Sequence, residues 1–317
     1  MTLLSVSDLR TTYRSGSAPV HAVDGVSLEV APGETVGLVG ESGCGKSTLG
    51  KTILRLVEPS AGSITFDGID LTTLPETRLR SYRRRLQMMF QDPFASLNPR
   101  QTIGDILRAP LDVHRIGTRR ERRQRVGEIL SQVGLPEDSA SRYPHEFSGG
   151  QRQRIGIARA LILGPDLIIC DEPVSALDLS VQAQVLNLLA DIKRKLKLSL
   201  LFISHDLSVV RYLSDRVLVM YLGRIVEAGT HEQIWKNPLH PYTRALIDAV
   251  PDPARRRYAA LLPGDLPDPR NTASGCRFRP RCPRATELCA HQDPALRASP
   301  SGQHVACHHA ELPAALF

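Results

Sequence analysis

The sequence predicts an α/β protein with a parallel sheet at its centre, and three observations lead to this prediction. Apolar runs alternate with helical patterns over the first ~250 residues, which is typical of α/β proteins. A glycine-rich segment, Gly40–Thr48, follows an apolar run and opens a helical pattern. A further apolar run, Leu167–Cys170, ends in two carboxylates. Ligands of α/β proteins bind at the carboxyl edge of the sheet, so we expect these carboxylates there.

The predicted elements of the first half alternate between strand and helix. Two strands around a turn at Pro32-Gly33, a helix and a short strand are expected at Val26–Val30, Thr35–Val39, Lys46–Leu56 and Leu86–Phe90. From Gln101 to about Ala140 the patterns are helical, at Thr102–Leu107 and Thr118–Val133, and no strand intervenes. The sequence therefore predicts a helical insertion between two parts of the α/β core.

The second half returns to alternating elements. A helix, a buried strand, a helix and another strand are expected at Gln151–Leu163, Leu167–Cys170, Val181–Lys195 and Leu200–Ile203. Val217–Tyr221 and Arg224–Glu227 flank Leu222-Gly223 as a hairpin, and Thr230 with Gln233 is typical of a helix start. Prolines then become frequent, at Pro251, Pro253, Pro263, Pro267 and Pro269. We therefore expect a domain boundary near residue 255.

Composition indicates a globular protein of the cytosol. Of 317 residues, 42% are hydrophobic and 23% are charged, as in soluble domains. No apolar stretch approaches the ~20 residues that span a bilayer, and Met1–Arg10 lacks a secretion signal. The net charge of +7 is concentrated in Arg78–Arg85 and Arg115–Arg125. Because Tyr82 is the only aromatic residue within these runs, we expect solvated helix faces rather than a surface for nucleic acid or anionic lipid.

The glycine-rich segment fits the phosphate-loop pattern G-x-x-x-x-G-K-[ST] at every position. Glycines let backbone N–H groups curl around phosphates, and the helix dipole adds to the attraction. We expect Lys46 to reach the β- and γ-phosphates and Ser47 to ligate Mg²⁺. The candidate ATP-binding residues are Gly40, Ser42, Gly43, Cys44, Gly45, Lys46, Ser47 and Thr48.

Two neighbouring carboxylates suit phosphoryl transfer. Asp171 ends the apolar run and is expected to hold Mg²⁺, directly or through its waters. Glu172 is adjacent and can polarise the attacking water. Phosphoryl transfer depends mainly on positioning and charge neutralisation, so this pair is a sensible catalytic set.

A second phosphate-facing element begins about a hundred residues after the phosphate loop. Ser148-Gly149-Gly150-Gln151, preceded by Phe147, opens a helix and is too distant in the chain to belong to the same loop. The chain is therefore expected to work as half of a pair, with ATP between the two halves.

The phosphate loop, the Ser148–Gln151 segment and the Asp171-Glu172 pair follow one another along the chain. In this order they resemble the ATP-binding cassette (ABC) family, over roughly residues 3–250. The resemblance implies an ABC-type P-loop core with an antiparallel β subdomain and a helical subdomain. It implies a cassette over residues 1–255, with the insertion at about 100–162. It also implies that the Ser148–Gln151 segment faces the γ-phosphate held by a second subunit; Phe147 replaces the commoner leucine.

The same resemblance implies roles for four further residues. Gln91 would contact Mg²⁺ or the attacking water, and His205 would contact the γ-phosphate. Asp178, within Ser175–Asp178, would communicate across the dimer, and Tyr13 would stack on adenine. The catalytic residues expected on this basis are Glu172, His205, Gln91 and Lys46.

Three more segments resemble the oligopeptide/dipeptide importer branch of that family, whose substrates also include nickel. They are an extended loop at Gln91–Arg100, a segment at His240–Arg244 and a cysteine motif at Gly275–Pro283. The resemblance implies a small Cys-rich C-terminal extension over residues 256–317.

Four of the six cysteines cluster near the C-terminus, at Cys276, Cys282, Cys289 and Cys307. In a reducing cytosol such a cluster indicates metal before disulfides. The resemblance implies a [4Fe–4S] cluster on these four residues. Zinc, free thiols and disulfides remain alternatives, although no Cys-x-x-Cys pair typical of zinc modules occurs. The arginines at 277, 279, 281 and 284 are expected to offset the charge of four thiolates.

The sequence thus predicts an ATP hydrolase that energises peptide import from the cytoplasmic face of the cell membrane. The expected partners are a second cassette, commonly a paralogue in that branch, two transmembrane permeases and an extracytoplasmic substrate-binding protein, with no nucleic acid. The alternative is a soluble ABC ATPase acting on nucleic acid or ribosomes. Co-purification with permeases favours the first, and salt-sensitive DNA binding favours the second. The cargo, dipeptide, oligopeptide or nickel, stays open.

Overall fold

The computed structural model describes residues 2–15, 18–92, 97–250, 264, 266–268, 270 and 274–310. The chain divides into two compact units. The first unit is formed by residues 31–34 and 73–202, and the second by residues 2–30, 35–72 and 203 onward. The domain boundary expected near residue 255 lies outside the described residues and stays a prediction.

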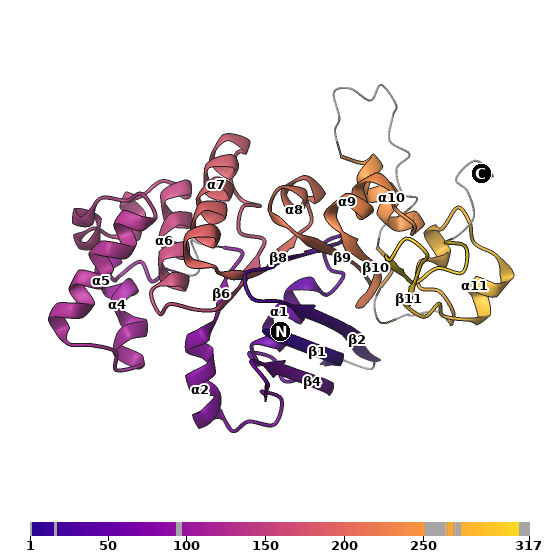
Figure 1. Ribbon diagram of the computed structural model, residues 1–317, viewed down its shortest axis with the longest axis horizontal. Coiled ribbons are helices and arrows are strands. Elements are labelled where there is room, and N and C mark those ends of the chain that lie inside the picture. The colour runs from indigo at the N-terminus through magenta and orange to yellow at the C-terminus, as the bar shows by residue number, and fades with distance from the viewer. Residues whose placement is uncertain are drawn as a thin grey trace. The chain divides into compact units, whose positions relative to one another are not determined.

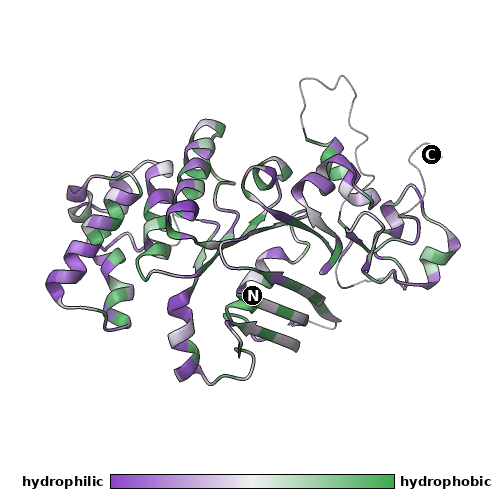
Figure 2. Ribbon diagram, in the orientation of Figure 1, coloured by the Kyte–Doolittle hydropathy of each residue, from purple (hydrophilic) through white to green (hydrophobic). Residues whose placement is uncertain are grey.

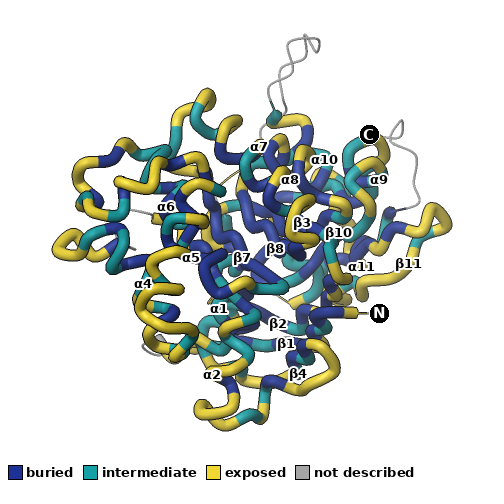
Figure 3. The backbone as a smooth tube through the Cα atoms, turned by 60° about the vertical axis from the view of Figure 1, so that its left-hand side comes forward, coloured by how far each residue is buried: buried dark blue, intermediate teal, exposed yellow. Residues whose placement is uncertain are grey.

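The first unit combines three strands of the larger sheet with helices (Figure 1). Its elements are α2 Glu76–Arg85, β6 Leu86–Met89, α4 Ile103–Val113, α5 Arg119–Gln132, η1 Glu137–Ser141, η2 Pro144–Glu146, α6 Gly149–Leu161, β7 Leu167–Asp171, α7 Leu179–Leu196 and β8 Ser199–Ser204, whose last two residues belong to the second unit. Strands β6 and β7 pair in parallel, and every residue of β7 and β8 is buried (Figure 3). Burial on both faces explains the continuous apolar runs of the sequence.

Between β6 and β7 the described residues form helices and no strand, which confirms the predicted helical insertion. Helix α5 begins where expected, with a capping box between Thr118 and Glu121. Helix α4, expected to end at Leu107, continues to Val113 through Pro110. Proline normally interrupts a helix because it lacks an N–H. Here the buried side chain of Leu111 keeps the last turn against the core.

The arginine run Arg78–Arg85 lies on α2, which is mostly hydrophilic in Figure 2. Leu79 is the buried residue of this helix. One buried apolar residue and a strongly basic exposed surface agree with the expected solvated face.

The second unit holds an antiparallel sheet and the rest of the larger sheet. Its elements are β1 Leu4–Ser15, β2 Ala18–Val30, β3 Thr35–Val39, α1 Lys46–Ile53, β4 Ala61–Phe66, β5 Ile69–Asp70, α8 Leu207–Leu213, β9 Arg216–Tyr221, β10 Arg224–Thr230, α9 His231–Lys236, α10 Pro241–Asp248, η3 Arg279–Arg281, α11 Glu287–His291, β11 Arg297–Ala298 and β12 His304–Val305. The antiparallel sheet has the order β2-β1-β4-β5, which confirms the antiparallel subdomain. Strand β3 pairs in parallel with β9, and β9 pairs antiparallel with β10.

Local signals decide the ends of several elements in this unit. Leu222 and Gly223 both have positive φ, at 42° and 82°, as a two-residue hairpin turn between β9 and β10 requires. The capping box of Thr230 and Gln233 opens α9. Helix α1 ends at Ile53, earlier than the expected Leu56, because Arg55 adopts a left-handed φ of 49°.

The C-terminal residues add two short strands to the larger sheet. Strand β12 pairs antiparallel with β10, with Val305 opposite Glu227, and β11 pairs with β12. Val305, Cys307 and Ala310 form a small buried cluster against which Leu239 packs. None of the helices in the described part of the chain is long and apolar enough to span a membrane.

Candidate functional site

The phosphate loop joins the buried strand β3 to helix α1. Lys46 is the first residue of α1, is buried, and its Nζ donates hydrogen bonds to the carbonyl oxygens of Gly40 at 2.7 Å and Glu41 at 2.9 Å. Gly45 has a φ of 109°, and a Cβ at this position would overlap the carbonyl oxygen of Ala22 in β2. Only glycine satisfies both conditions, so the loop is tightly fitted to the strand beside it.

Glu41, which the sequence analysis did not single out, is held from two sides. Its backbone N–H donates to the Tyr242 hydroxyl at 2.8 Å. Its carboxylate accepts two hydrogen bonds from the Arg281 guanidinium, at 2.6 and 2.9 Å. Tyr242 is fully buried, and its ring lies 5.5 Å from that of Phe278. The similarity of the His240–Arg244 and Gly275–Pro283 segments to one branch was the only signal for these residues.

The remaining candidates of the second unit differ in exposure. Tyr13 lies on β1 opposite Val20 and is 40% exposed, so its ring is accessible. Ser42 and Gly43 are exposed, whereas Ser47 and Thr48 are partly buried in the first turn of α1. Cys44 is buried, and this burial raises the pKa of its thiol. His205 directly follows β8 and is exposed.

In the first unit, the structure brings Gln91 and Glu172 together. The Gln91 side-chain amide donates to a Glu172 carboxylate oxygen at 3.1 Å. Asp171 ends β7 and is buried, and Glu172 is only 9% exposed. Glu172 also has a φ of 48°, a conformation that costs a non-glycine residue about 1–3 kcal/mol and concentrates at functional sites. The polar contact and the strained backbone single out Glu172 without reference to any motif.

The Ser148–Gln151 segment caps its own helix. The Ser148 hydroxyl accepts from the Gln151 N–H at 3.4 Å, and the Gln151 side-chain oxygen accepts from the Ser148 N–H at 3.0 Å. This box starts α6 at Gly149, two residues before the expected Gln151. A Cβ on Gly150 would lie 2.5 Å from Val181 Cγ1 in α7, whose N-terminal cap is Asp178. The starts of α6 and α7 are therefore in close contact.

The four C-terminal cysteines lie near one another in the second unit. None of the six cysteines, all of which the structure describes, forms a disulfide. Burial and then the neighbouring thiols raise the pKa of Cys282 to about 11, although an N–H from Arg284 at 3.4 Å opposes this. Cys307 accepts a similar N–H bond from His309 at 3.4 Å. Among the described residues, no three or more His, Cys, Asp or Glu side chains are arranged to hold a metal ion.

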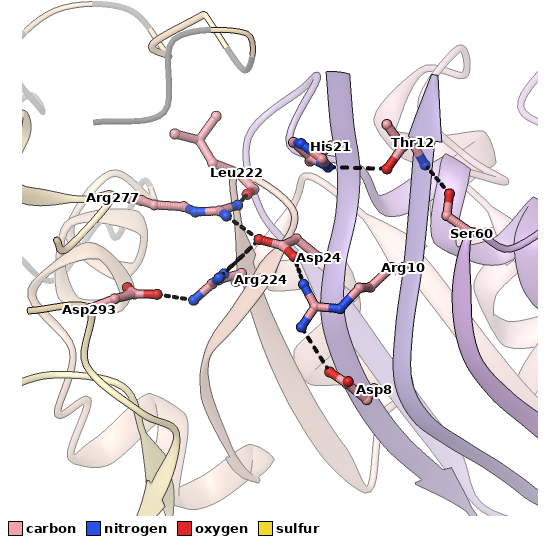
Figure 4. Close-up of polar contacts among 10 residues, drawn as sticks. All are labelled: Asp8, Arg10, Thr12, His21, Asp24, Ser60, Leu222, Arg224, Arg277 and Asp293. Atoms are coloured by element: carbon pink, nitrogen blue, oxygen red, sulfur yellow. Dashed lines mark hydrogen bonds and ion pairs between the residues drawn. The ribbon is translucent and has the colours of Figure 1, made fainter. Parts of the chain in front are cut away.

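The expectation that the arginines of this segment offset thiolate charge is wrong for two of the four. Arg281 pairs with Glu41 instead, and Arg277 pairs with Asp24 and donates to the Leu222 carbonyl (Figure 4). Carboxylates attract guanidinium groups more strongly than protonated thiols do. Arg279 and Arg284 still act on the cysteines, since their charges lower the pKa of Cys276 and Cys307, respectively, against the larger effect of burial.

Two family matches cover most of the described chain. Residues 23–175 match the ABC transporter family. Residues 226–289 match the family described as oligopeptide/dipeptide transporter, C-terminal region.

Two relatives match along almost the whole length of the chain. A putative peptide import ATP-binding protein of Brucella ovis is 56% identical, over 96% of this chain and 97% of its own. An oligopeptide transport ATP-binding protein of Bacillus subtilis is 52% identical, over 97% of each chain. A solved dimeric ATP-binding cassette in a post-hydrolysis state, bound to ADP and phosphate, is 30% identical, with a TM-score of 0.66 over 72% of this chain and 98% of its own.

Proposed function

Because this chain belongs to the ABC transporter family, whose ATP-binding subunits couple ATP hydrolysis to transport, we propose that it energises the import of peptides. The observation that carries the proposal is the identity above 50% to peptide import and oligopeptide transport ATP-binding proteins over more than nine-tenths of each chain. The match of the C-terminal segment to the oligopeptide/dipeptide branch supports the same cargo class.

The residues proposed to act on ATP occur in both units. Lys46 would exchange its two carbonyl acceptors for β- and γ-phosphate oxygens. Ser47 and Asp171 would hold Mg²⁺, and Glu172 would polarise the attacking water. The hydrogen bond from Gln91 supports this role, because it fixes the position of the Glu172 carboxylate. His205 would contact the γ-phosphate, and the exposed ring of Tyr13 would stack on adenine.

The proposed partner for the Ser148–Gln151 segment is a second cassette. The capped N-terminus of α6 carries the positive end of the helix dipole, which suits a phosphate held by another subunit. Asp178, at the adjoining start of α7, would pass the state of one site to the other. The complete assembly would add two membrane permeases and an extracytoplasmic binding protein, with this subunit at the cytoplasmic face of the membrane. A paralogous second cassette fits this proposal as well as an identical one.

The experiment that tests the catalytic assignment is Glu172→Gln in the assembled transporter. We expect ATP binding to persist and turnover to fall at least ~100-fold, because the amide cannot polarise water. Glu128→Gln, an exposed isosteric change on α5, is the matched control and should hydrolyse ATP normally. Substantial turnover by Glu172→Gln would contradict the role given to Glu172.

We further propose that Cys276, Cys282, Cys289 and Cys307 hold a [4Fe–4S] cluster, which would act as a covalent crosslink of the C-terminal segment. The neighbouring thiols and the N–H bonds to sulfur support this, because such bonds stabilise ligating thiolates. Zinc is the alternative metal, because thiolates bind it as well.

The test of the cluster is the visible spectrum of anaerobically purified protein, with metal content measured beside it. We expect a brown protein with a broad absorption band and about four irons per chain. Cys282→Ser should lose the band. A colourless preparation with one zinc per chain would overturn the cluster and leave the ATPase assignment intact.

A further inference from the structure

Two arginines that adjoin cysteines reach the phosphate loop by separate routes within the second unit. The first route runs through Arg281, which precedes Cys282 and is 5% exposed. Its guanidinium grips both carboxylate oxygens of Glu41, a bidentate geometry that lysine cannot reproduce. The carbonyl oxygen of the same Glu41 accepts from Lys46 Nζ at 2.9 Å. One residue thus separates the cysteine motif from the lysine of the phosphate loop.

The second route runs through Arg277, which follows Cys276. Figure 4 shows its guanidinium between Asp24 of β2 and the Leu222 carbonyl of the β9–β10 turn. The next residue of that turn, Gly223, donates its N–H to the Cys44 carbonyl of the phosphate loop at 2.8 Å. Arg277 therefore holds in place the turn that is hydrogen-bonded to Cys44, in the middle of the phosphate loop.

Asp24 is the shared anchor of this second route. Arg10 of β1 and Arg224 of β10 pair with the same carboxylate, and the Asp24 N–H donates to the Gly223 carbonyl at 2.9 Å. Arg277 belongs to residues 274–310, here called the cysteine segment. It thus adds a third guanidinium to a site that already joins β1, β2 and β10.

The cysteine segment is itself a firm base for these contacts. The Cys276 N–H donates to the Cys289 carbonyl at 2.9 Å, and the Phe278 ring packs 5.2 Å from Tyr221 and 5.5 Å from Tyr242. Movement of this segment would move both guanidinium groups. The phosphate loop cannot absorb such a shift freely, because Gly45 already lies against the Ala22 carbonyl.

We propose that Arg281 and Arg277 are positioning residues that hold the phosphate loop in its nucleotide-binding shape, so that the cysteine segment controls ATP affinity. The inference rests on the proposed role of the phosphate loop and goes beyond it, since it assigns the C-terminal segment a function in the ATPase cycle. By linkage, ATP must in turn stabilise the cysteine segment by the same factor.

The primary experiment is a double-mutant cycle on Arg281 and Glu41, measured as ATP affinity of the full chain in a Glu172→Gln background that prevents turnover. Arg281→Gln and Glu41→Gln should each weaken ATP binding about tenfold. The double variant should be no weaker than either single one, because each change breaks the same contact. The ATP affinity of Arg281→Lys should lie between those of Arg281→Gln and the parent, since lysine keeps the positive charge but cannot make the bidentate contact.

Two controls separate positioning from general damage. Arg297→Gln removes an exposed arginine of the same segment and should leave ATP affinity unchanged. In an otherwise unmodified chain, Arg281→Gln should raise KM for ATP with little change in kcat, because the chemistry of the bound state is untouched. Additive losses in the cycle, or affinity of Arg281→Gln equal to that of its parent, would overturn the proposal.

Lys46→Ala distinguishes the failure of this inference from failure of the proposed function. If Lys46→Ala no longer binds ATP and Arg281→Gln binds ATP normally, the positioning role of Arg281 is wrong and the phosphate-loop assignment stands. If Lys46→Ala still binds ATP normally, the phosphate-loop assignment is wrong, and the positioning role loses its premise.

The reciprocal effect gives a readout that does not depend on activity. ATP should slow amide hydrogen exchange in residues 276–282 of the Glu172→Gln chain, by a factor similar to the affinity change. Arg281→Gln should abolish this protection, while Arg297→Gln should preserve it. Exchange rates that ATP leaves unchanged in the parent chain would overturn the coupling.

Discussion

The phosphate loop and the Ser148–Gln151 segment are both glycine-rich helix starts suited to phosphate, yet different parts of the chain hold them in shape. The phosphate loop is fixed by residues that are distant in sequence: Ala22, Gly223, Tyr242 and Arg281. The Ser148–Gln151 segment is fixed by its own capping box and by contact with Val181, about thirty residues later.

Two segments with similar anion-binding chemistry can therefore be held in shape by distant residues in one case and by nearby residues in the other. A capping box depends on residues of a single turn, because its two partners are three positions apart. A loop braced by remote segments keeps its shape only while those segments are in place. The phosphate loop is therefore open to control from the C-terminal region, whereas the helix start of α6 is self-contained.

The largest effect expected is from Gly45→Ala, which tests how rigid the surroundings of the phosphate loop are. The new Cβ would overlap the Ala22 carbonyl at a φ of 109°, and a strand backbone cannot move aside. We expect a loss of about 4 kcal/mol in the free energy of unfolding, measured in urea, and loss of ATP binding.

Gly150→Ala is the matching change in the other segment. Its Cβ meets a side chain, Val181 Cγ1, and the helix gains from replacing glycine, so the net loss should be only about 1 kcal/mol. Adding Val181→Ala to the Gly150→Ala chain should reduce this loss of stability. If both alanine substitutions cost the same and Val181→Ala rescues nothing, the two segments are held equally rigidly and the contrast is lost.

The second effect concerns the carboxylate that braces the turn beside the phosphate loop. Asp24 is buried among Arg10, Arg224 and Arg277 (Figure 4). Asp24→Asn leaves three guanidinium groups facing a neutral amide, and we expect a loss of about 3 kcal/mol in urea unfolding at neutral pH. Asp67→Asn, on the β4–β5 turn, is an exposed control and should change stability by less than about 1 kcal/mol.

The pH dependence of this loss has a definite sign. Burial opposes ionisation of Asp24, but the hydrogen bonds and charges of Arg224 and then Arg277 hold its pKa below the usual 3.8. A depressed folded-state pKa means that the stabilisation is fully present above the unfolded value and declines as pH falls through the folded one. The difference in stability between wild type and Asp24→Asn should therefore be constant from about pH 7 to 5 and shrink below about pH 4. A difference that grows on acidification would contradict the ion-pair explanation.

Elements governed by nearby residues could be predicted from the sequence. The capping box of Thr230, the helix that starts after Thr118, the hairpin turn at Leu222-Gly223 and the buried strand before Asp171 all appear as expected. Each depends on residues within a few positions of one another, or on a continuous apolar run. Errors at helix ends had local causes that only coordinates reveal, such as the left-handed Arg55 after α1.

Contacts between distant segments could not be predicted in this way. The arginines beside the cysteines were expected to face thiolates, because charge balance was the only argument the sequence offered. In the structure Arg277 and Arg281 meet carboxylates that lie more than two hundred residues earlier, at Asp24 and Glu41. Strand β12 is likewise too short to leave a pattern, and it forms only where β10 provides a partner. The phosphate loop was thus recognisable by motif while its supports were not.

The smallest effect expected is from Ser148→Ala, and it examines the local side of the comparison. Removing the capping hydroxyl should cost about 1 kcal/mol of stability, because one N–H of α6 loses its acceptor. Thr118→Ala removes an equivalent cap from α5 and should cost a similar amount.

The two cap variants should differ in function, which is the sharper half of this prediction. Ser148→Ala should lower ATPase activity in the assembled transporter while the isolated chain keeps its ATP affinity, because its own nucleotide sits on the phosphate loop and not on α6. Thr118→Ala should leave both quantities unchanged. If Ser148→Ala weakened ATP binding in the isolated chain as strongly as Arg281→Gln, the start of α6 would be coupled to the phosphate loop of its own chain. The self-contained character argued from the capping box would then be wrong, and the two phosphate-facing segments would have to be treated as one mechanical unit.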